Sequence, residues 1–489
     1  MKSCVLFCLL VGFAAGATVA HAEFTDHFAD KTMRIDYYHT GDGTSETVAI
    51  DRIYEYGTWA GSVRNLVDGL NYGAYYHKIY DALTGEIIYS RGFDSYFKEY
   101  QTSGPARDGV VRTFHESAIV PSPTVHVFFV IEKRQKEGHL EEVFRVEIDP
   151  DDVMIIRDEG PDRSVKVFRS LHNGDPHKKA DIAIIGEGYT ANEEYKFRRD
   201  LARFTKTFFK RDPCKSYKKY FNVYGVFKPS HQTGIDEPRH GSFRNSVVGA
   251  TFNSMGSERY ILTEENKALR DIARHVPYDA LYIMINHHRY GGGGIYNFYC
   301  TFTSDNQWSE YLMVHEFGHS FFGLADEYYT SSTAYEDFYP KGYEPAEPNI
   351  TAALDPDNIK WGHLISDDIE IPTPWEKKSY DQMSLSWQKV RTRLNDGIAE
   401  LRRSRASNDE VRKAEEEYDL RDREQAGMVR KYLDGSVFAD QVGAFQGAGY
   451  ATTGLYRPMI DCIMFSKGQT NFCKVCEEAM VKIIMNYAE

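Results

Sequence analysis

The sequence predicts a multidomain α+β protein, in which an N-terminal antiparallel β-sandwich is followed by an α/β domain with an inserted helical hairpin. Three observations support this fold class. Short runs with apolar residues at every second position dominate the chain up to about residue 160. Beyond that point, nearly continuous apolar runs alternate with segments of helical periodicity. Residues of about 375–432 then change to a densely charged composition with helical spacing.

Length and composition limit the possible classes of protein. The 489 residues are enough for two or three domains with sizeable cores. Aromatic residues make up 14% of the chain, a proportion that argues against disorder. The formal net charge of −14 argues against nucleic acid, and against an anionic membrane surface, as the main partner.

Residues 1–22 are predicted to be a signal peptide. Lys2 gives the positive start, Val5–Ala17 is an apolar run, and the Ala-His-Ala of residues 20–22 fits a cleavage site. The run is short for a membrane-spanning helix, which needs about 20 apolar residues, and an uncleaved anchor is the alternative. We therefore expect a mature chain that starts near Glu23 and is secreted, periplasmic or bound to the cell surface. After cleavage it would not be an integral membrane protein.

Residues 23–160 are expected to form the β-sandwich. The runs 86–90, 125–131 and 142–148 have a period near two and are rich in β-branched and aromatic residues. Turn-forming Gly, Pro, Asp and Ser residues bound these runs. Residues 158–176 are charged and rich in turn formers, which is typical of a domain boundary, so we place the boundary at residue 160.

Residues 161–489 are expected to form the α/β domain. The runs Ala180–Gly186, Tyr220–Phe227 and Asp279–Ile285 have the pattern of strands, and the first and last are apolar enough to be buried on both faces. Helical periodicity follows the first two runs, and this alternation predicts an open sheet covered by helices. A final amphipathic helix is expected over Glu477–Tyr487.

Four consecutive glycines, Gly291–Gly294, precede an aromatic-rich run that ends at Thr303. The glycines predict a mobile loop, and the run predicts an edge strand. Such an edge can pair with an extended peptide by β-addition. An ordinary edge strand without a partner is the alternative.

The insertion at about 375–432 is expected to be a hairpin of two helices. Trp387, Leu394 and Leu401 lie on one helical stripe, and Ser407 and Glu410 have the spacing of a capping box for a second helix. The remaining residues carry charges of both signs, which is typical of a solvated face. We favour a solvent-facing insertion, with a lid or a partner-binding surface as the alternative.

The segment from His315 to His319, with the sequence His-Glu-Phe-Gly-His, is the strongest indication of chemistry in the chain. On a helix, residues four apart share one face, so the two histidines can bind one metal ion. Glu316 beside them would act as a general base, the arrangement used by zinc peptidases. The alternative is a core helix whose two histidines are hydrogen-bonded.

A third ligand is expected just after this helix. Gly323 can end the helix, and Asp326 follows three residues later from a sharp turn. A catalytic zinc ion needs three protein ligands and one open position, so His315, His319 and Asp326 would complete the set. Glu327 is the alternative third ligand.

Five cysteines remain after the predicted signal peptide, namely Cys214, Cys300, Cys462, Cys473 and Cys476. In an oxidising compartment some of them are expected to pair, with at least one left over. The last three can also form a structural zinc site, but no fourth ligand is evident. We favour a disulfide, whose partners the spacing does not identify.

Several stretches of the chain resemble one family, the IgA-peptidase family of secreted bacterial zinc metallopeptidases. They are residues 183–190, 220–223, 234–238, 315–328, 456–458, 462–464 and 472–476. The resemblance extends over essentially the whole chain, and the extended zinc motif is its most specific part. It implies one catalytic zinc ion and a protein or peptide substrate, with host glycoproteins among the candidates.

This family resembles the metzincins, in which a methionine lies in a tight turn under the zinc ion. Met464 would take this position as a packing platform for the ligands. Tyr456 and Arg457 precede it and are candidates for stabilising the oxyanion, with structural packing as the alternative. The chain departs from the usual metzincin spacing, because the glycine falls one residue late and Asp326 stands in place of a histidine.

The sequence therefore predicts a secreted zinc metalloendopeptidase in which Glu316 deprotonates a zinc-activated water. Two other functions stay open. A zinc hydrolase of a non-peptide bond would use the same motif, because the motif fixes the water and not the substrate. An extracellular binding protein on a degenerate peptidase scaffold is the second, although the intact motif argues against degeneracy.

Overall fold

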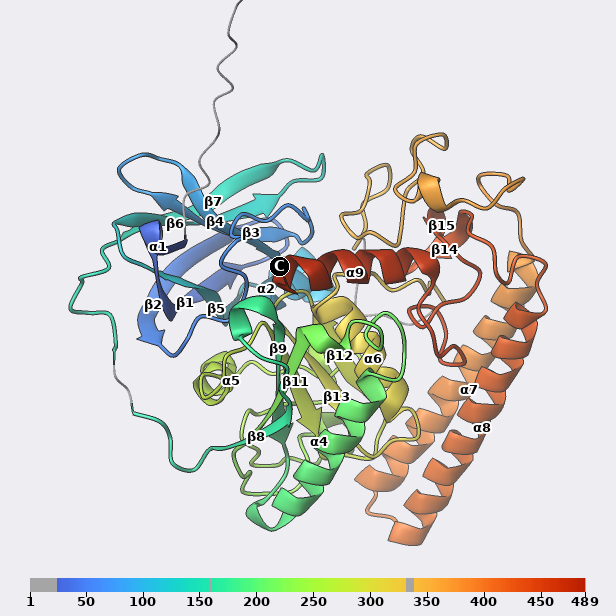
Figure 1. Cartoon of the computed structure of the whole chain (residues 1–489). Helices are drawn as coiled ribbons and strands as arrows, with labels where there is room; N and C mark the ends of the chain where they lie inside the picture. The colour runs from blue at the N-terminus through green and yellow to red at the C-terminus, as the bar shows by residue number, and fades with distance from the viewer. Residues whose placement is uncertain (1–23, 158–159, 331–337, 489) are drawn as a thin grey trace, which may run out of the picture.

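The structure is a computed structural model that describes residues 24–157, 160–330 and 338–488. The predicted signal peptide, residues 1–22, lies outside the described residues. Figure 1 shows the β-rich N-terminal part in blue, a central sheet in green and yellow, and a long helical pair in orange. In the described part of the chain, no helix combines the length and the apolar character needed to cross a bilayer.

The N-terminal part contains two antiparallel sheets. In the first sheet, β1 (Phe28–Gly41) lies between β2 (Glu46–Tyr56) and β5 (Arg112–Pro123). The second sheet has the order β4 (Ile87–Phe93), β3 (Tyr75–Asp81), β6 (Val127–Arg134) and β7 (Leu140–Ile148). Three short helices accompany them: α1 (Phe24–His27), α2 (Tyr96–Gln101) and α3 (Gly104–Arg107).

The two N-terminal sheets share one hydrophobic core. Ile35 of β1, Ala118 of β5, Ile79 of β3 and Phe129 of β6 are each 0% exposed and belong to a single cluster. Alternate side chains of a strand point to opposite faces, so the period-two pattern in the sequence gives each sheet one inward face. Two antiparallel sheets packed in this way agree with the sandwich expected from the sequence.

A mixed sheet of six strands organises the second part. Its order is β12 (Gly292–Ile295), β13 (Tyr299–Thr303), β11 (Ala280–Ile285), β9 (Ala180–Glu187), β10 (Phe221–Phe227) and β8 (Lys166–Leu171). The four inner strands are parallel, and the edge strands β12 and β8 are antiparallel to their neighbours. The predicted open sheet is therefore present, with antiparallel edges that the sequence pattern did not indicate.

Helices cover both faces of this sheet. Ile182 and Ile184 of β9 pack in one core with α4 (Glu194–Phe208) and α6 (Ser309–Ser320). Ala183 and Ile185 of β9 pack in another core with α5 (Asn266–Ala273). Because every residue of β9 is buried, a continuous apolar run was the correct signal for this strand.

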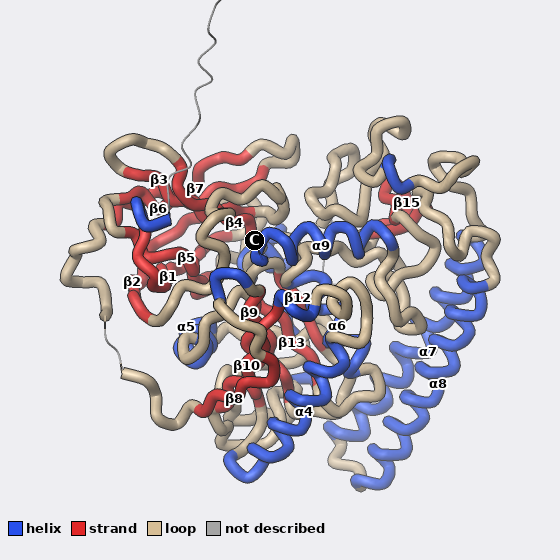
Figure 2. The backbone as a smooth tube through the Cα atoms, viewed as in Figure 1, coloured by secondary structure: helices blue, strands red, loops and turns tan. Residues whose placement is uncertain are grey.

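The remaining elements follow the sheet. They are α7 (Lys377–Arg403), α8 (Asn408–Asp434), β14 (Phe445–Ala448), β15 (Ala451–Arg457) and α9 (Lys474–Ala488). Short 3-10 helices lie in connecting segments at Pro176–Lys178, Ala191–Glu193, Lys218–Tyr220, Pro238–His240, Ser254–Gly256 and Gly362–Leu364. Figure 2 shows that strands concentrate in the N-terminal part and the central sheet, whereas the side that carries α7 and α8 is mostly helix and loop, with β15 as a short strand among them.

The N-terminal part packs directly against the second part. Tyr96, Phe97 and Tyr100 of α2 lie in the same hydrophobic core as α5. Arg91 of β4 donates hydrogen bonds to Asn297 Oδ1 at 3.0 Å and to Tyr487 of α9 at 2.5 Å. The two parts therefore form a continuous body, and the space between them can belong to one site.

Candidate metal centre

Helix α6 carries the His-Glu-Phe-Gly-His segment through the centre of the molecule. Its side chains are buried on nearly every side, so it is a core helix and not an amphipathic surface helix. Gly323 follows it with φ of 57°, a left-handed conformation that glycine adopts without strain. This turn reverses the chain and brings Asp326 back beside the helix.

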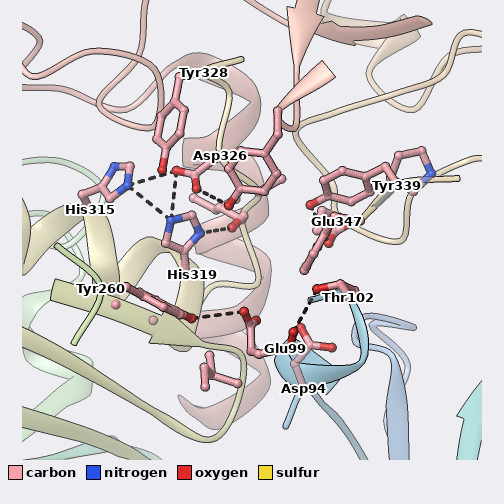
Figure 3. A pocket seen from close by; sticks show the side chains of 18 of the residues that line it. Asp94, Glu99, Thr102, Tyr260, His315, His319, Asp326, Tyr328, Tyr339 and Glu347 are labelled. Atoms are coloured by element: carbon pink, nitrogen blue, oxygen red, sulfur yellow. Dashed lines mark hydrogen bonds and ion pairs between the residues drawn. The ribbon is translucent and has the colours of Figure 1, made fainter. Parts of the chain in front are cut away.

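Three donor atoms converge at this point. The Nε2 atoms of His315 and His319 are 3.3 Å apart, and Asp326 Oδ1 lies 3.1 Å and 3.2 Å from them. A tetrahedral zinc ion with bonds of about 2.0 Å has edges of about 3.3 Å between its ligand atoms. The donor set and its spacing therefore fit a zinc ion with one position left open. Figure 3 shows the three side chains turned toward one another.

The outer nitrogens of both rings are fixed by backbone carbonyls. Nδ1 of His315 donates to the carbonyl of Ile463 at 3.0 Å, and Nδ1 of His319 donates to that of Leu324 at 2.6 Å. A carbonyl can only accept, so each Nδ1 carries a proton and each Nε2 is the atom left to face a metal ion. Both rings are thus held in the tautomer and orientation that a metal ion requires.

Asp326 is held in the charged form. Burial works to raise its pKa, but the imidazoles of His319 and His315 hold the pKa of this carboxyl well below its usual range. Its Oδ2 accepts a hydrogen bond from the Tyr450 hydroxyl at 2.5 Å. Its buried Oδ1 has only the two histidines beside it and no hydrogen-bond donor in the described structure. An orphaned carboxylate oxygen at this point is what a cation would satisfy.

Glu316 lies next to the two imidazoles. Its carboxylate oxygen and the two ring nitrogens are within 4.8 Å of one another. Burial is the main reason why the pKa of Glu316 is raised above its usual value. A raised pKa makes this carboxylate a stronger base toward a proton donor beside it.

These residues open into a large cleft of about 840 Å³ between the two parts of the molecule. One wall comes from the sheet edge and α6, and the opposite wall includes Asp94, Glu99 and Thr102 of the N-terminal part. Tyr260 donates a hydrogen bond to Glu99 at 3.1 Å and so links the two walls. Figure 3 shows this arrangement, with the histidines and the N-terminal residues on opposite sides.

The helical pair α7 and α8 forms a further wall. Trp387 and Arg391 of α7 and Gln425 of α8 line the cleft, and Asp422 accepts a hydrogen bond from the indole of Trp308 at 2.7 Å. An ion pair of Arg402 with Glu415 links the two helices, and a capping box at Ser407 begins α8. The expectation of a purely solvent-facing insertion is therefore wrong, because one face of the pair shapes the cleft.

The glycine run is a strand and not the mobile loop expected from the sequence. Gly292–Ile295 form β12, and a Cβ atom on Gly294 would come within 2.4 Å of the Glu316 carbonyl. A Cβ atom on Gly292 would come within 3.0 Å of Glu316 Oε1. Glycine is needed here because the edge strand approaches α6 closely.

Met464 lies beneath α6 in a tight turn. It is 0% exposed, and a Cβ atom on Gly318 would come within 2.7 Å of its sulfur. The turn is closed by the Phe465 amide, which donates to the Cys462 carbonyl at 2.8 Å. The Met464 carbonyl accepts from the Glu327 amide at 2.9 Å, so this turn also supports the segment that carries Asp326.

The structure places three of the expected residues away from the cleft. Arg457 is 0% exposed and donates to the Gly447 and Ile460 carbonyls, at 2.8 Å and 3.2 Å, so it packs in the core. Tyr456 pairs through its backbone with Thr351 and is not among the described residues that line the cleft. Glu327 points to the opposite side of the chain from Asp326, toward the cysteines.

The cleft also contains residues that the sequence did not single out. Tyr328 stacks beside His315, and the guanidinium of Arg259 lies over the Tyr328 ring, with Nη2 3.4 Å from the hydroxyl. Tyr328 belongs to the quoted motif stretch, but Arg259 and Tyr450 reach the site from distant segments. No spacing in the sequence could have linked them to it.

The five described cysteines are all free, so the disulfide favoured from the sequence is absent. Cys214 and Cys300 are buried in the same hydrophobic core as α6. Cys462, Cys473 and Cys476 meet one another and Glu327.

Comparison with protein families covers most of the chain. The family model described as IgA Peptidase M64 matches residues 169–484, and the one described as Peptidase M64 N-terminus matches residues 23–145. Among the curated proteins that were compared, none matches this chain. The two matches confirm the resemblance that the motifs indicated: the chain belongs to the IgA peptidase M64 family of metallopeptidases.

Proposed function

We propose that the protein is a secreted zinc metalloendopeptidase in which His315, His319 and Asp326 hold the ion and Glu316 is the general base. The observation that carries this proposal is the triangle of donor atoms, with edges of 3.1–3.3 Å, beside a buried carboxyl in a cleft. Met464 would support the ligands from below, since its sulfur packs under Gly318.

His315, His319 and Asp326 would hold the zinc ion, which when bound would supply a water of lowered pKa and polarise the scissile carbonyl. Glu316 takes the proton from the attacking water and passes it to the leaving amine nitrogen. The raised pKa of Glu316, caused mainly by burial, suits both steps. The carbonyl contacts of the two Nδ1 atoms keep the imidazoles from turning during the reaction.

Tyr328 and Arg259 are the best placed residues to stabilise the negative charge that forms on the substrate oxygen. Both line the cleft on the side of His315. Burial is the main reason why the pKa of Tyr328 lies well above its usual value, so its hydroxyl stays a hydrogen-bond donor. These two residues replace Tyr456 and Arg457 in this role.

The edge strand β12 supports binding of an extended peptide. The amide and carbonyl of Gly292 bond to Arg259 and Ile261 on the cleft side, at 3.1 Å and 3.2 Å. Alternate residues of a strand turn their backbone groups to the same side, so Gly294 presents its own amide and carbonyl there. A substrate that pairs with Gly294 through its backbone needs no free terminus, which favours an endopeptidase.

The substrate is proposed to be a protein or peptide, and the export predicted from residues 1–22 belongs to the same proposal. The family's description refers to immunoglobulin A, a host glycoprotein, so glycoproteins of this kind are the first substrates to assay. Denatured casein and small ester substrates complete the panel. Turnover of esters without any cleavage of protein would favour a hydrolase of non-peptide bonds.

The deciding experiment is Glu316→Gln. The variant should keep the zinc content of the wild type and lose cleavage of protein substrates by about 10²–10⁴-fold, the range typical of a general base. Glu310→Gln on the same helix is the matched control, because Glu310 faces solvent and pairs with Lys210. Undiminished cleavage by Glu316→Gln, or an equal loss in the control, would refute the assignment.

A further inference from the structure

Glu327, Cys462, Cys473 and Cys476 form a second cluster of metal-binding side chains, separate from the cleft. The three cysteines and the glutamate are at most 3% exposed. Their sulfur atoms and one carboxylate oxygen all lie within 4.8 Å of one another. None of the four lines the cleft, so the cluster is not part of the site described above.

The spacing of these atoms fits a tetrahedral zinc ion. Cys462 Sγ and Cys476 Sγ are 3.9 Å apart, and Glu327 Oε1 lies 3.3 Å from Cys476 Sγ and 3.8 Å from Cys473 Sγ. With Zn–S bonds of about 2.3 Å and Zn–O bonds of about 2.0 Å, the tetrahedral edges are about 3.8 Å and about 3.5 Å. A disulfide would need the sulfur atoms at about 2.05 Å.

Glu327 provides an independent indication of a cation. It is 0% exposed, and its Oε1 accepts hydrogen bonds from the Asn349 side chain at 3.1 Å and from the thiols of Cys476 and Cys473 at 3.3 Å and 3.8 Å. Its Oε2 is buried without any hydrogen-bond partner in the described structure. A buried carboxylate oxygen without a donor is costly, and a bound cation removes that cost.

Local dipoles and one cation oppose the burial that raises the pKa of Cys462 and Cys476. Cys473 and Cys476 lie at the N-terminal end of α9, where the helix dipole stabilises negative charge. The Cys473 amide donates to Cys462 Sγ at 3.3 Å, and the Cys476 amide donates to Cys473 Sγ at 3.5 Å. The fully buried Arg457 interacts electrostatically with Glu327. This interaction explains why Arg457 is buried, which the oxyanion role did not.

We propose that Glu327, Cys462, Cys473 and Cys476 bind a second, structural Zn²⁺ ion. Four protein ligands leave no open position for water, which is the arrangement of structural zinc sites and not of catalytic ones. Three thiolates select zinc over magnesium or calcium, which prefer oxygen ligands. The sequence indicated the three cysteines as candidate ligands, whereas only the folded structure identifies Glu327 as the fourth.

The buried ion would tie together three segments that support the cleft. Glu327 adjoins Asp326, Cys462 lies in the turn that presents Met464, and Cys476 anchors α9. Asn349 binds the same segment from the other side, because its side chain bonds both the amide and the carbonyl of Ala325. Loss of this ion should therefore loosen Asp326 as well as lower stability.

Metal analysis of the full-length protein tests the proposal without using activity. We expect two zinc ions per chain in the wild type and one in the double variant His315→Ala/His319→Ala. X-ray absorption at the zinc edge of that variant should show sulfur at about 2.3 Å. A double variant without zinc, or one whose zinc has only nitrogen and oxygen neighbours, would overturn the proposal.

Cysteine variants sharpen this test. Cys473→Ser/Cys476→Ser should lose one zinc ion and the sulfur signal, whereas the control Cys214→Ser, also a buried free cysteine, should keep both. If the double variant does not fold, the wild type can be tested instead. Its metal is removed with a chelator, the chain is denatured without a reductant, and its free thiols are alkylated. All five cysteines that follow the predicted signal peptide should be alkylated, and a disulfide among Cys462, Cys473 and Cys476 would refute the site.

The outcome is distinguishable from failure of the proposed peptidase function. A wild type with a single, sulfur-bound zinc ion and no proteolysis would remove the catalytic proposal and leave the structural site intact. Two ions with normal proteolysis, one of them bound by sulfur, would support both.

Discussion

Asp326 and Glu327 are neighbours in the chain, yet they face two different environments. The carbonyls of Asp326 and Tyr328 accept hydrogen bonds from Gly449 and Tyr450, whereas the Glu327 amide donates to Met464 on the other side. This alternation, typical of a strand, sends one carboxylate to two imidazoles at an open cleft. The Glu327 carboxylate instead points toward three thiols in the buried core.

The comparison shows how environment separates a proposed catalytic site from a proposed structural site at adjacent residues. The site of Asp326 has three donors and borders a cleft of about 840 Å³, so a fourth position is available to water and substrate. The site of Glu327 has four donors and no opening to the cleft, so an ion there would be closed off. Five variants, described from the largest expected effect to the smallest, can break or sharpen this contrast.

Asp326→Asn and Glu327→Gln should separate the two sites most strongly. Asp326→Asn should lower kcat/KM by more than the roughly 10–100-fold that loss of a supporting residue costs, with little change in Tm. Glu327→Gln should lower the free energy of unfolding by about 1–3 kcal/mol, through the lost contact of a buried charged group, and leave more activity. Equal losses of activity and of stability in both variants would contradict the division of roles.

Tyr450→Phe should weaken zinc binding at the cleft without touching the cysteines. It removes the hydroxyl that donates to Asp326 Oδ2, and such losses cost about 10–100-fold in metal affinity. Competition with a zinc-binding dye measures this affinity. Tyr339→Phe is the control, because Tyr339 stacks on Tyr450 but donates to Glu347, and its zinc affinity should not change.

Gly318→Ala should disturb the support shared by both sites. The new methyl group would meet the Met464 sulfur in a filled core, and overpacking of this kind costs about 1–3 kcal/mol of unfolding free energy. Chemical denaturation measures the loss. The control is Gly427→Ala in α8, where no atom lies within 4 Å of the added Cβ and stability should rise by about 0.5–1 kcal/mol. A Gly318→Ala variant as stable as the wild type would show that Met464 can move aside.

Asp181 and Asp279 are a buried acidic pair outside both proposed metal sites, and they provide a third case for the comparison. Asp279 accepts a hydrogen bond from the Asp181 amide, and burial is the main reason why the pKa of each carboxyl is raised, with Asp279 also raising that of Asp181. The folded state therefore holds protons that the unfolded state has released. Stability should accordingly fall as pH rises above the ordinary aspartate pKa of about 4.

Asp181→Asn should flatten this pH dependence by more than about 1 kcal/mol between pH 5 and pH 9. Unfolding in urea, measured on the inactive Glu316→Gln background to prevent self-cleavage, gives the slope. An unchanged slope would show that this pair is not the source of the pH dependence. The pair then would not be an example of a buried carboxyl that stays protonated where no cation is present.

The local patterns of the sequence determined much of this protein. Period-two runs located β4, β6 and β7, apolar runs located β9, β10 and β11, and the motif from His315 to His319 located α6. These signals succeed because a strand or helix imposes its own period on the side chains that it buries. The capping box at Ser407 formed for the same reason, since both of its hydrogen bonds are local.

Only the tertiary structure decided which distant groups meet. Which of Asp326 and Glu327 faces the histidines depends on hydrogen bonds to residues 449, 450 and 464. The glycine run became an edge strand because α6 packs against it, and Arg457 went to the core rather than the cleft. Glu327 lies beside the cysteines because of a turn that the spacing of residues in the sequence does not predict. The periodicity of a sequence reflects interactions between residues that are close along the chain. A binding site is made by residues distant in the sequence, which only folding brings within a few ångströms of one another.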